Sequence, residues 1–162
     1  MSTGDDQETN DIGTLRGRDY PSIRQFSIFS PNKVGQLLHL IRTIESHKLR
    51  VCALSISDSA ECAIIRIVIT QPERAYEILK QCGYAFCEVD LLVVELPNQA
   101  QPVLAICSTL LQAEINVNYC FPLLVSPYGR PALGFSVDDH ELAASVLDRA
   151  GFVVLTEADL ES

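Results

Sequence analysis

The sequence predicts an α+β fold made from two copies of one small unit, and three observations lead to this prediction. Hydrophobic residues make up 48% of the 162 residues and charged residues 20%, which is the balance of a globular chain that can bury a core. From Ile23 onward, stretches with apolar residues at every second position are interleaved with stretches at helical spacing. The second half of the chain repeats the first.

Two Pro-Asn pairs mark the repeat, since Pro31-Asn32 in the first copy matches Pro97-Asn98 in the second. Near the end of each copy Gly83 matches Gly151, and the additional residues of the second copy fit in the loop that holds Tyr128. Apolar residues coincide along this alignment: Leu38 with Leu104, Leu40 with Ile106, Ile44 with Leu110, Leu49 with Ile115 and Val51 with Val117. The chain is therefore a duplication.

Each element of the first copy has its own signal. Phe26 and Ile28 alternate along residues 25–30, which predicts a strand that ends at the Pro-Asn turn. Helical spacing predicts a helix over 33–46, and two strands follow over 49–57 and 61–70. Thr70 and Glu73 form a capping-box pattern at the start of a second helix, which stops at Gly83 before a strand over 84–89.

The second copy repeats this order of elements. We expect a strand over 91–96, a helix over 101–113, strands over 116–125 and 130–137, a helix over 138–150 and a strand over 152–155. The order β-α-β-β-α-β is ferredoxin-like, an antiparallel sheet with both helices on one face. A unit of about 65 residues is marginally stable alone. We therefore expect two modules in tandem, over 23–90 and 91–162, that pack together behind a flexible tail over 1–22.

The charge balance excludes several classes of function. Twelve Lys and Arg against twenty-one Asp and Glu give a net charge of −9, which repels phosphate backbones and anionic lipid. The first ten residues contain no apolar block, and the longer apolar stretches are too short to span a bilayer. We expect a cytoplasmic protein that binds neither nucleic acid nor membrane.

Cysteine and histidine give no sign of catalysis or of a metal site. The six cysteines include no CxxC pair and none lies near a histidine at zinc-ligand spacing. Most are expected to be small core residues in a reducing compartment. His39, His47 and His140 do not suggest a nucleophile-base pair. We predict no catalytic residues, no metal and no cofactor.

The repeated unit resembles the ACT domains, which are small-molecule-binding regulatory modules of many amino-acid biosynthetic enzymes. The resemblance rests on three stretches: residues 27–37 (SIFSPNKVGQL), 93–100 (VVELPNQA) and 114–119 (EINVNY). Each motif is degenerate by itself, but the first two recur at matching places of the two copies. Because no enzyme domain accompanies the pair, the chain most resembles the stand-alone tandem ACT proteins of bacteria.

The resemblance implies that a free amino acid binds where two modules meet. The first strand–helix loop of one module would face the second strand of the other. The implied ligand-binding residues are Asn32, Lys33, Val34, Gly35, Gln36 and Leu37 in the first module and Asn116, Val117, Asn118 and Tyr119 in the second. The helix N-terminus suits an α-carboxylate, and Gly35 lets the backbone approach a ligand.

The exchanged arrangement would form a second site, in which Asn98 and Gln101 face Val51 and Cys52. Gln101 occupies the position that matches Gly35, so a long side chain replaces the glycine. Pro102 follows and removes one backbone N–H. We therefore predict that this second site is degraded.

Simpler interpretations stay open beside these. Asn32 can serve only as a helix cap, Gly35 only as a close packing point, and Asn116 and Asn118 only as solvated edge residues. The chain is then either an amino-acid-binding regulator, homodimeric and partnered with an enzyme of amino-acid metabolism, or a ligand-free interaction module. The latter would act through sheet-edge or helix-face dimerisation.

Overall fold

A computed structural model describes residues 19–31, 34–58 and 61–161. The first module contains β1 (Ile23–Pro31), α1 (Gln36–Ser46), β2 (Val51–Asp58), β3 (Cys62–Ile69) and α2 (Pro72–Gln81). The strand β4 (Ala85–Glu95) follows, and then α3 (Pro102–Gln112), β5 (Val117–Pro122), β6 (Ala132–Val137) and α4 (His140–Arg149). The short helices η1 (Pro127–Gly129) and η2 (Glu157–Glu161) complete the second module. The predicted tandem of ferredoxin-like α+β modules is confirmed.

One strand serves both modules. The sheet has six antiparallel strands in the order β2-β3-β1-β4-β6-β5. The N-terminal half of β4 pairs with β1, and residues Leu92–Glu95 pair with β6. The separate strands predicted over 84–89 and 91–96 are therefore one continuous strand, and the expected border between the modules falls inside it. The strand predicted over 152–155 is reduced to an isolated bridge between Val94 and Val154.

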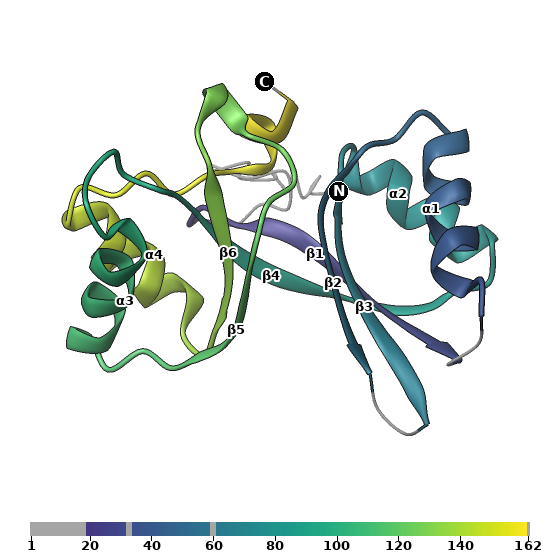
Figure 1. The fold of residues 1–162 in the computed structure, drawn as a ribbon, viewed down its shortest axis with the longest axis horizontal. Helices are drawn as coiled ribbons and strands as arrows, with labels where there is room; N and C mark the ends of the chain where they lie inside the picture. The colour runs from purple at the N-terminus through teal and green to yellow at the C-terminus, as the bar shows by residue number, and fades with distance from the viewer. Residues whose placement is uncertain (1–18, 32–33, 59–60, 162) are drawn as a thin grey trace, which may run out of the picture.

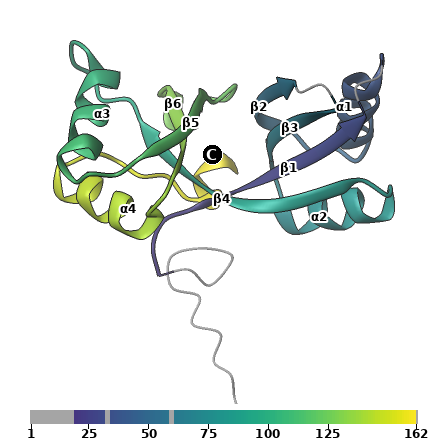
Figure 2. The same ribbon diagram turned by 90° about the horizontal axis from the view of Figure 1, so that it is seen from below.

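The sheet curls so that its two ends approach each other. The helices α1 and α2 lie at one outer end of the molecule and α3 and α4 at the other, with the strands between them (Figure 1). Seen from below, β1 and β4 cross the middle while β2–β3 and β5–β6 rise on either side (Figure 2). The edges meet at a bridge between Ala53 and Leu123, and the amide of Leu124 donates to the carbonyl of Cys52 at 2.8 Å.

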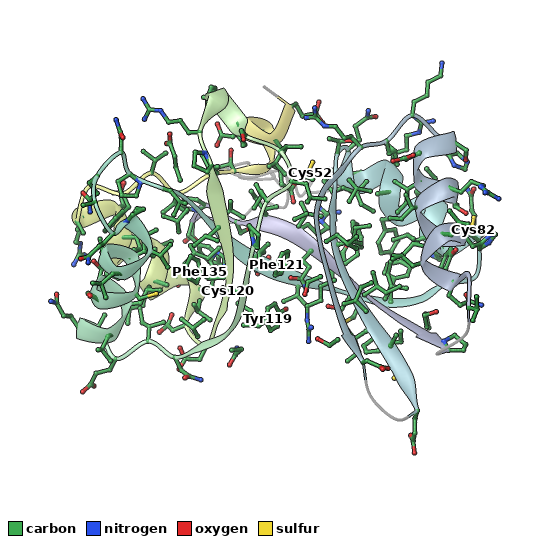
Figure 3. All side chains as sticks on the ribbon, in the orientation of Figure 1. Cys52, Cys82, Tyr119, Cys120, Phe121 and Phe135 are labelled. Atoms are coloured by element: carbon green, nitrogen blue, oxygen red, sulfur yellow. The ribbon has the colours of Figure 1, made fainter. Side chains whose placement is uncertain are left out.

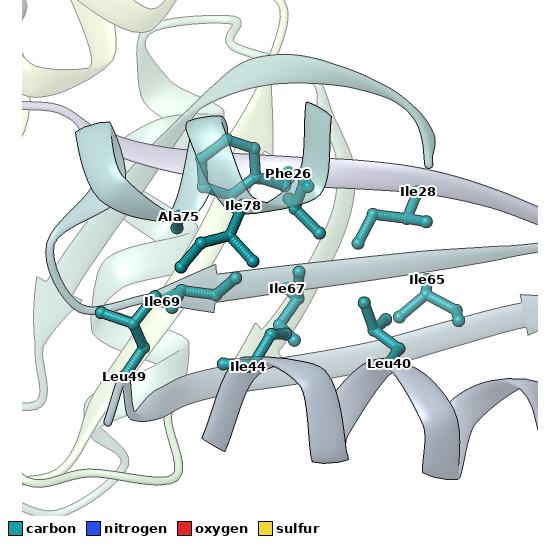
Figure 4. Close-up of a cluster of buried hydrophobic side chains, with 11 residues drawn as sticks. Phe26, Ile28, Leu40, Ile44, Leu49, Ile65, Ile67, Ile69, Ala75 and Ile78 are labelled. Carbon is teal, nitrogen blue, oxygen red and sulfur yellow. The ribbon is translucent and has the colours of Figure 1, made fainter. Parts of the chain in front are cut away.

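Three apolar cores result from this curl. In the first module α1 and α2 cover one face of the sheet with residues such as Phe26, Leu40 and Ile78 (Figure 4). The second module repeats this arrangement around Phe135. A third core fills the space between the two modules, on the sheet face opposite the helices, and includes Leu91. The third core supplies the burial that each small module lacks alone.

The C-terminal segment ties the modules together. Leu155 and Leu160 are buried in the central core, and the guanidinium of Arg50 donates to the carbonyl of Leu160 at 3.1 Å. The carboxylate of Glu157, which is buried, accepts the backbone N–H of Arg24 at 2.9 Å. The segment that follows the last repeat is therefore part of the fold.

Arg24 is buried at the centre of an ionic cluster. Its guanidinium reaches Glu73 at 2.6 Å, Glu88 at 3.3 Å and Glu157 at 3.9 Å, while its own side chain is 4% exposed. Burial lowers the pKa of Arg24, but the hydrogen bond that its guanidinium donates to Glu73 and the charges of Glu157 and Glu88 outweigh burial and raise the pKa above its ordinary value. Arg24 is thus charged in the folded protein.

The capping box predicted at α2 does not form. The helix is preceded by Gln71 in the left-handed conformation, without a side-chain cap. The hydroxyl of Thr70 instead accepts the backbone N–H of Arg50 at 2.8 Å. The hydroxyl that the local pattern assigned to the helix thus bonds to Arg50, the residue before β2, which is distant in sequence. The flexible tail predicted over 1–22 lies for the most part outside the described residues.

Cysteine burial differs from the expectation. Only Cys52 is buried; Cys62 is intermediate, and Cys82, Cys87, Cys107 and Cys120 are exposed. Most of these cysteines lie on strands and helices that have one buried and one exposed side. Apolar neighbours in the sequence do not tell on which side a cysteine lies, so they did not predict its exposure. None of the six forms a disulfide.

Cys52 is expected to resist alkylation in the folded protein. Burial raises the pKa of its thiol, and the thiolate is the reactive form. At neutral pH, iodoacetamide followed by peptide mass spectrometry should modify the four exposed cysteines and leave Cys52 intact until denaturant is added. Labelling of Cys52 as fast as that of Cys120 would contradict its burial on β2 in the core between the modules.

No helix among the described residues is both long enough and apolar enough to cross a membrane.

Candidate functional site

The first predicted segment surrounds the start of α1. Asn32 and Lys33 lie outside the described residues. Val34 is fully exposed, and Gly35 adopts a left-handed conformation with φ 87° directly before the helix. Gln36 is half-buried, and Leu37 packs against the edge of the first core. The carbonyl of Gly35 accepts the amide of His39 at 3.0 Å, so this glycine sets the first helical turn.

The second predicted segment lies on β5 and is tied mainly to its own module. The backbone amide of Asn116 donates to Asp138 at 3.1 Å, and the side-chain amide of Asn118 lies 3.5 Å from the hydroxyl of Ser136. Val117 packs at the edge of the second core. These contacts match the simpler interpretation of the asparagines as polar edge residues.

Tyr119 is the member of this segment that reaches the first module. Gln25, fully buried on β1, donates its amide to the Tyr119 hydroxyl at 2.9 Å. The guanidinium carbon of Arg66 on β3 lies 4.1 Å from the centre of the tyrosine ring, a cation–π distance. Figure 3 places Tyr119 in the middle of the molecule, between the modules. Its partners are strand residues and not the loop before α1.

The described part of the first segment, residues 34–37, is therefore not brought together with residues 116–119 inside one chain. In both views the helix α1 lies at the outer end of the first module, whereas β5 lies on the inner side of the second (Figures 1 and 2). Among the described residues, no hydrogen bond or ion pair joins residues 34–37 to residues 116–119.

The matching loop of the second module borders two adjoining cavities. They have volumes of about 190 and 320 Å³ and share Leu96, Pro97, Asn98 and Arg130. Pro102 and Pro131 line the larger one, and Glu95, Gly151, Phe152 and Val153 line the smaller one. We call this pair of cavities the Asn98 groove.

Gln101, like Gly35, adopts a left-handed conformation directly before its helix. Its φ of 56° and ψ of 54° are left-handed, and α3 begins at the next residue, Pro102. A residue with a Cβ pays about 1 kcal/mol for this conformation, but the turn keeps its shape. The sequence predicted a degraded second site because the long side chain of Gln101 replaces glycine. The backbone before the helix is left-handed in both loops, with ψ of −4° at Gly35 and 54° at Gln101.

Val51 and Cys52, expected to face Asn98, lie elsewhere. Both belong to β2, and Cys52 is buried in the central core. Neither lines the Asn98 groove. The groove is lined by residues of the second module instead.

Sequence reasoning missed Glu95 and Arg130. An ion pair of 3.1 Å joins the Arg130 guanidinium to the Glu95 carboxylate at the groove. Two signals were available. Glu95 is the one charged residue of the otherwise apolar stretch 91–96. Arg130 belongs to the loop in which the second copy is longer than the first.

Known proteins support the fold. The chain is similar to a protein from Bacteroides thetaiotaomicron, with a TM-score of 0.79 and 21% identity over 88% of this chain and 98% of that one. It is also similar to the ligand-free regulatory subunit of aspartate kinase from Thermus thermophilus, with a TM-score of 0.55 and 11% identity over 82% and 94% of the two chains. A third similar structure is the regulatory subunit of aspartate kinase from Thermus flavus. Its TM-score is 0.52, and the identity is 13% over 82% of this chain and 94% of that one.

No curated protein matches the chain. A family model described as ACT domain pair matches residues 21–162, a range that takes in both modules, the Asn98 groove and the C-terminal segment. The chain belongs to the ACT domain pair family.

Proposed function

We propose that the chain is a regulatory protein that senses a free amino acid and has no catalytic activity of its own. ACT domains are regulatory, and two proteins with a similar fold are regulatory subunits of aspartate kinase. The observation that carries the proposal is the Asn98 groove, a cavity at the strand–helix loop with the amide of Asn98 and the start of α3 beside it. Helix N-termini favour carboxylates.

The proposal includes a homodimer in the cytoplasm. The loop at Gly35–Leu37 and the segment Asn116–Tyr119 do not meet within one chain, so a site that uses both requires a second copy. In the dimer the first module of one chain would face the second module of its partner. A net charge of −9 disfavours nucleic acid and anionic membranes as partners, and an enzyme of amino-acid metabolism is the partner that we propose.

The ligand would act by shifting a population of conformations. The strand β4 ends at Glu95 in the Asn98 groove and continues into the sheet of the first module, where it pairs with β1. A ligand that prefers one position of this strand therefore biases both modules, and a partner enzyme would respond to that bias.

A thermal-shift screen against the twenty free amino acids tests the proposal. One or two related amino acids should raise the melting temperature, since a ligand at a hundredfold excess over its Kd stabilises the folded state by about 2.7 kcal/mol. A flat response at millimolar concentrations would contradict amino-acid sensing.

Gly35→Gln, measured in the same screen, separates the two loops. A Cβ at Gly35 meets no atom within 4 Å, although a side chain is strained at its φ of 87°. Gln101 is itself left-handed at the matching position of the second module, so the variant should fold, less stably than the unaltered protein. A smaller ligand-induced shift would implicate the first loop. An unchanged shift would exclude that loop and be the result expected of binding in the Asn98 groove.

The alternative is an interaction module without a small ligand, and one observation favours it. Leu38 on α1 and Leu104 on α3 occupy matching positions of the repeat and are 59% and 57% exposed, and Leu111 on α3 is 75% exposed. Exposed leucines on the outer helices are typical of a docking surface. Under this alternative, Leu104→Glu would abolish association with a partner while the amino-acid screen stays flat.

A further inference from the structure

We propose that Glu95 and Arg130 form a receptor for the two charges of a zwitterionic α-amino acid, with the carboxylate of Glu95 binding the ligand ammonium and the guanidinium of Arg130 binding the ligand carboxylate. This inference rests on the proposed function and specifies its chemistry at the Asn98 groove.

The backbone holds Glu95 firmly at the floor of the groove. It is the last residue of β4, opposite Ala132 of β6, and its amide donates to the carbonyl of Val153 at 2.9 Å on the other side. Its side chain is 9% exposed. A carboxylate buried to this extent is costly unless a cation accompanies it.

Arg130 is the cation that accompanies it, and it lies at the rim. Its side chain is 67% exposed, and its Nη1 lies 3.1 Å from Oε1 of Glu95. It lines both cavities, whereas Glu95 lines the smaller one. An exposed guanidinium retains free N–H donors, and its planar fork matches a carboxylate in a bidentate manner.

A zwitterion is the ligand that leaves neither residue unpaired. When the ligand ammonium approaches Glu95, the buried carboxylate keeps a cationic partner, and Arg130 is released to bind the ligand carboxylate. A ligand with only one of the two charges would leave either Glu95 or Arg130 without its counterpart. Unpaired polar groups in a site are the basis of strong discrimination. The pair therefore selects for the α-amino and α-carboxylate groups together.

The first test uses the unaltered protein. Each amino acid that raises the melting temperature is compared, by isothermal titration calorimetry, with its N-acetyl derivative, which lacks the ammonium, and with its amide, which lacks the carboxylate. Each derivative should bind at least about tenfold more weakly than the free amino acid, because one charge-assisted contact is lost. Derivatives that bind within twofold of the free amino acid would overturn the inference.

Variants then assign the two charges. Arg130→Gln should weaken binding of the free amino acid about tenfold and leave binding of the amide unchanged. Glu95→Gln should also weaken binding of the free amino acid about tenfold, and it should leave binding of the N-acetyl derivative unchanged. Arg74→Gln and Glu77→Gln, charge changes at exposed positions of α2, serve as matched controls with unchanged affinity. Where a variant is also followed by thermal shift, its melting temperature with ligand is compared with that of the same variant without ligand.

The outcomes separate the inference from the function on which it rests. Amino-acid binding that both groove variants retain would overturn the receptor and leave the sensor intact. No binding of any amino acid by the unaltered protein would overturn both. If Glu95→Gln fails to fold, the derivative series and the rim variant Arg130→Gln still decide the question.

Discussion

Replacing Arg24 with alanine is expected to destabilise the fold by about 3–5 kcal/mol, because the substitution removes the guanidinium that lies 3.9 Å from the buried carboxylate of Glu157. Arg24 is 4% exposed and contacts three glutamates from α2, β4 and the C-terminal segment. The loss therefore affects the attachment of that segment as well as the first module. Chemical denaturation followed by circular dichroism measures the change.

Arg74→Ala is the matched control, since Arg74 lies exposed on the same helix that supplies Glu73. Its effect should stay within about 0.5 kcal/mol. Equal effects of the two variants would show that the ionic cluster contributes nothing to stability. Because the folded state raises the pKa of Arg24, its contribution is present at every pH below the ordinary arginine value and is lost only above the raised one. The difference between Arg24→Ala and the unaltered protein should thus be constant between about pH 7 and 10.

Leu91→Ala is expected to cost about 2–5 kcal/mol, because it opens a cavity in the core between the modules. Leu91 is fully buried on β4, the strand that both modules share. Gly134 on β6 lies against it, and a Cβ at Gly134 would come within 2.7 Å of the Leu91 Cδ2 atom. Gly134→Ala alone should therefore also destabilise the protein, by about 1–3 kcal/mol through overpacking.

The double variant provides the decisive comparison. With Leu91 reduced to alanine, the new methyl group at position 134 no longer clashes and fills part of the cavity. The double variant should be less destabilised than the sum of the single variants by at least about 0.5 kcal/mol. Strict additivity in equilibrium unfolding would mean that the two residues are not packed against each other.

Local patterns in the sequence were sufficient to predict most helices and strands and to indicate the family. Alternation along β1 and helical spacing along α1 predicted both elements, and the repeat of the Pro-Asn pairs predicted the second module. Local patterns failed where a distant partner intervened. The Thr70 hydroxyl accepts a hydrogen bond from the amide of Arg50 and does not cap α2. The two strands expected over 84–89 and 91–96 form the single strand β4, which pairs with both β1 and β6.

The candidate site was predictable only in part. The strand–helix loops at Gly35 and Gln101 were found from sequence because both precede helices, and both adopt the left-handed conformation. The partners of these loops were not found. Val51 and Cys52 are alternating strand residues whose burial depends on the curl of the whole sheet, and Arg130 is distant in sequence from the carboxylate that it contacts.

The sequence by itself determined the duplication and most of the elements, because hydrophobic periodicity and turn residues act within a few positions of one another, and its motifs carried the resemblance to the family. The tertiary structure decided which surfaces meet. Only the curl of the sheet places β2 beside the end of β5, buries Arg24 among three glutamates and brings Arg130 to Glu95. These contacts depend on strand twist and on packing summed over the whole chain, which no short stretch of sequence records.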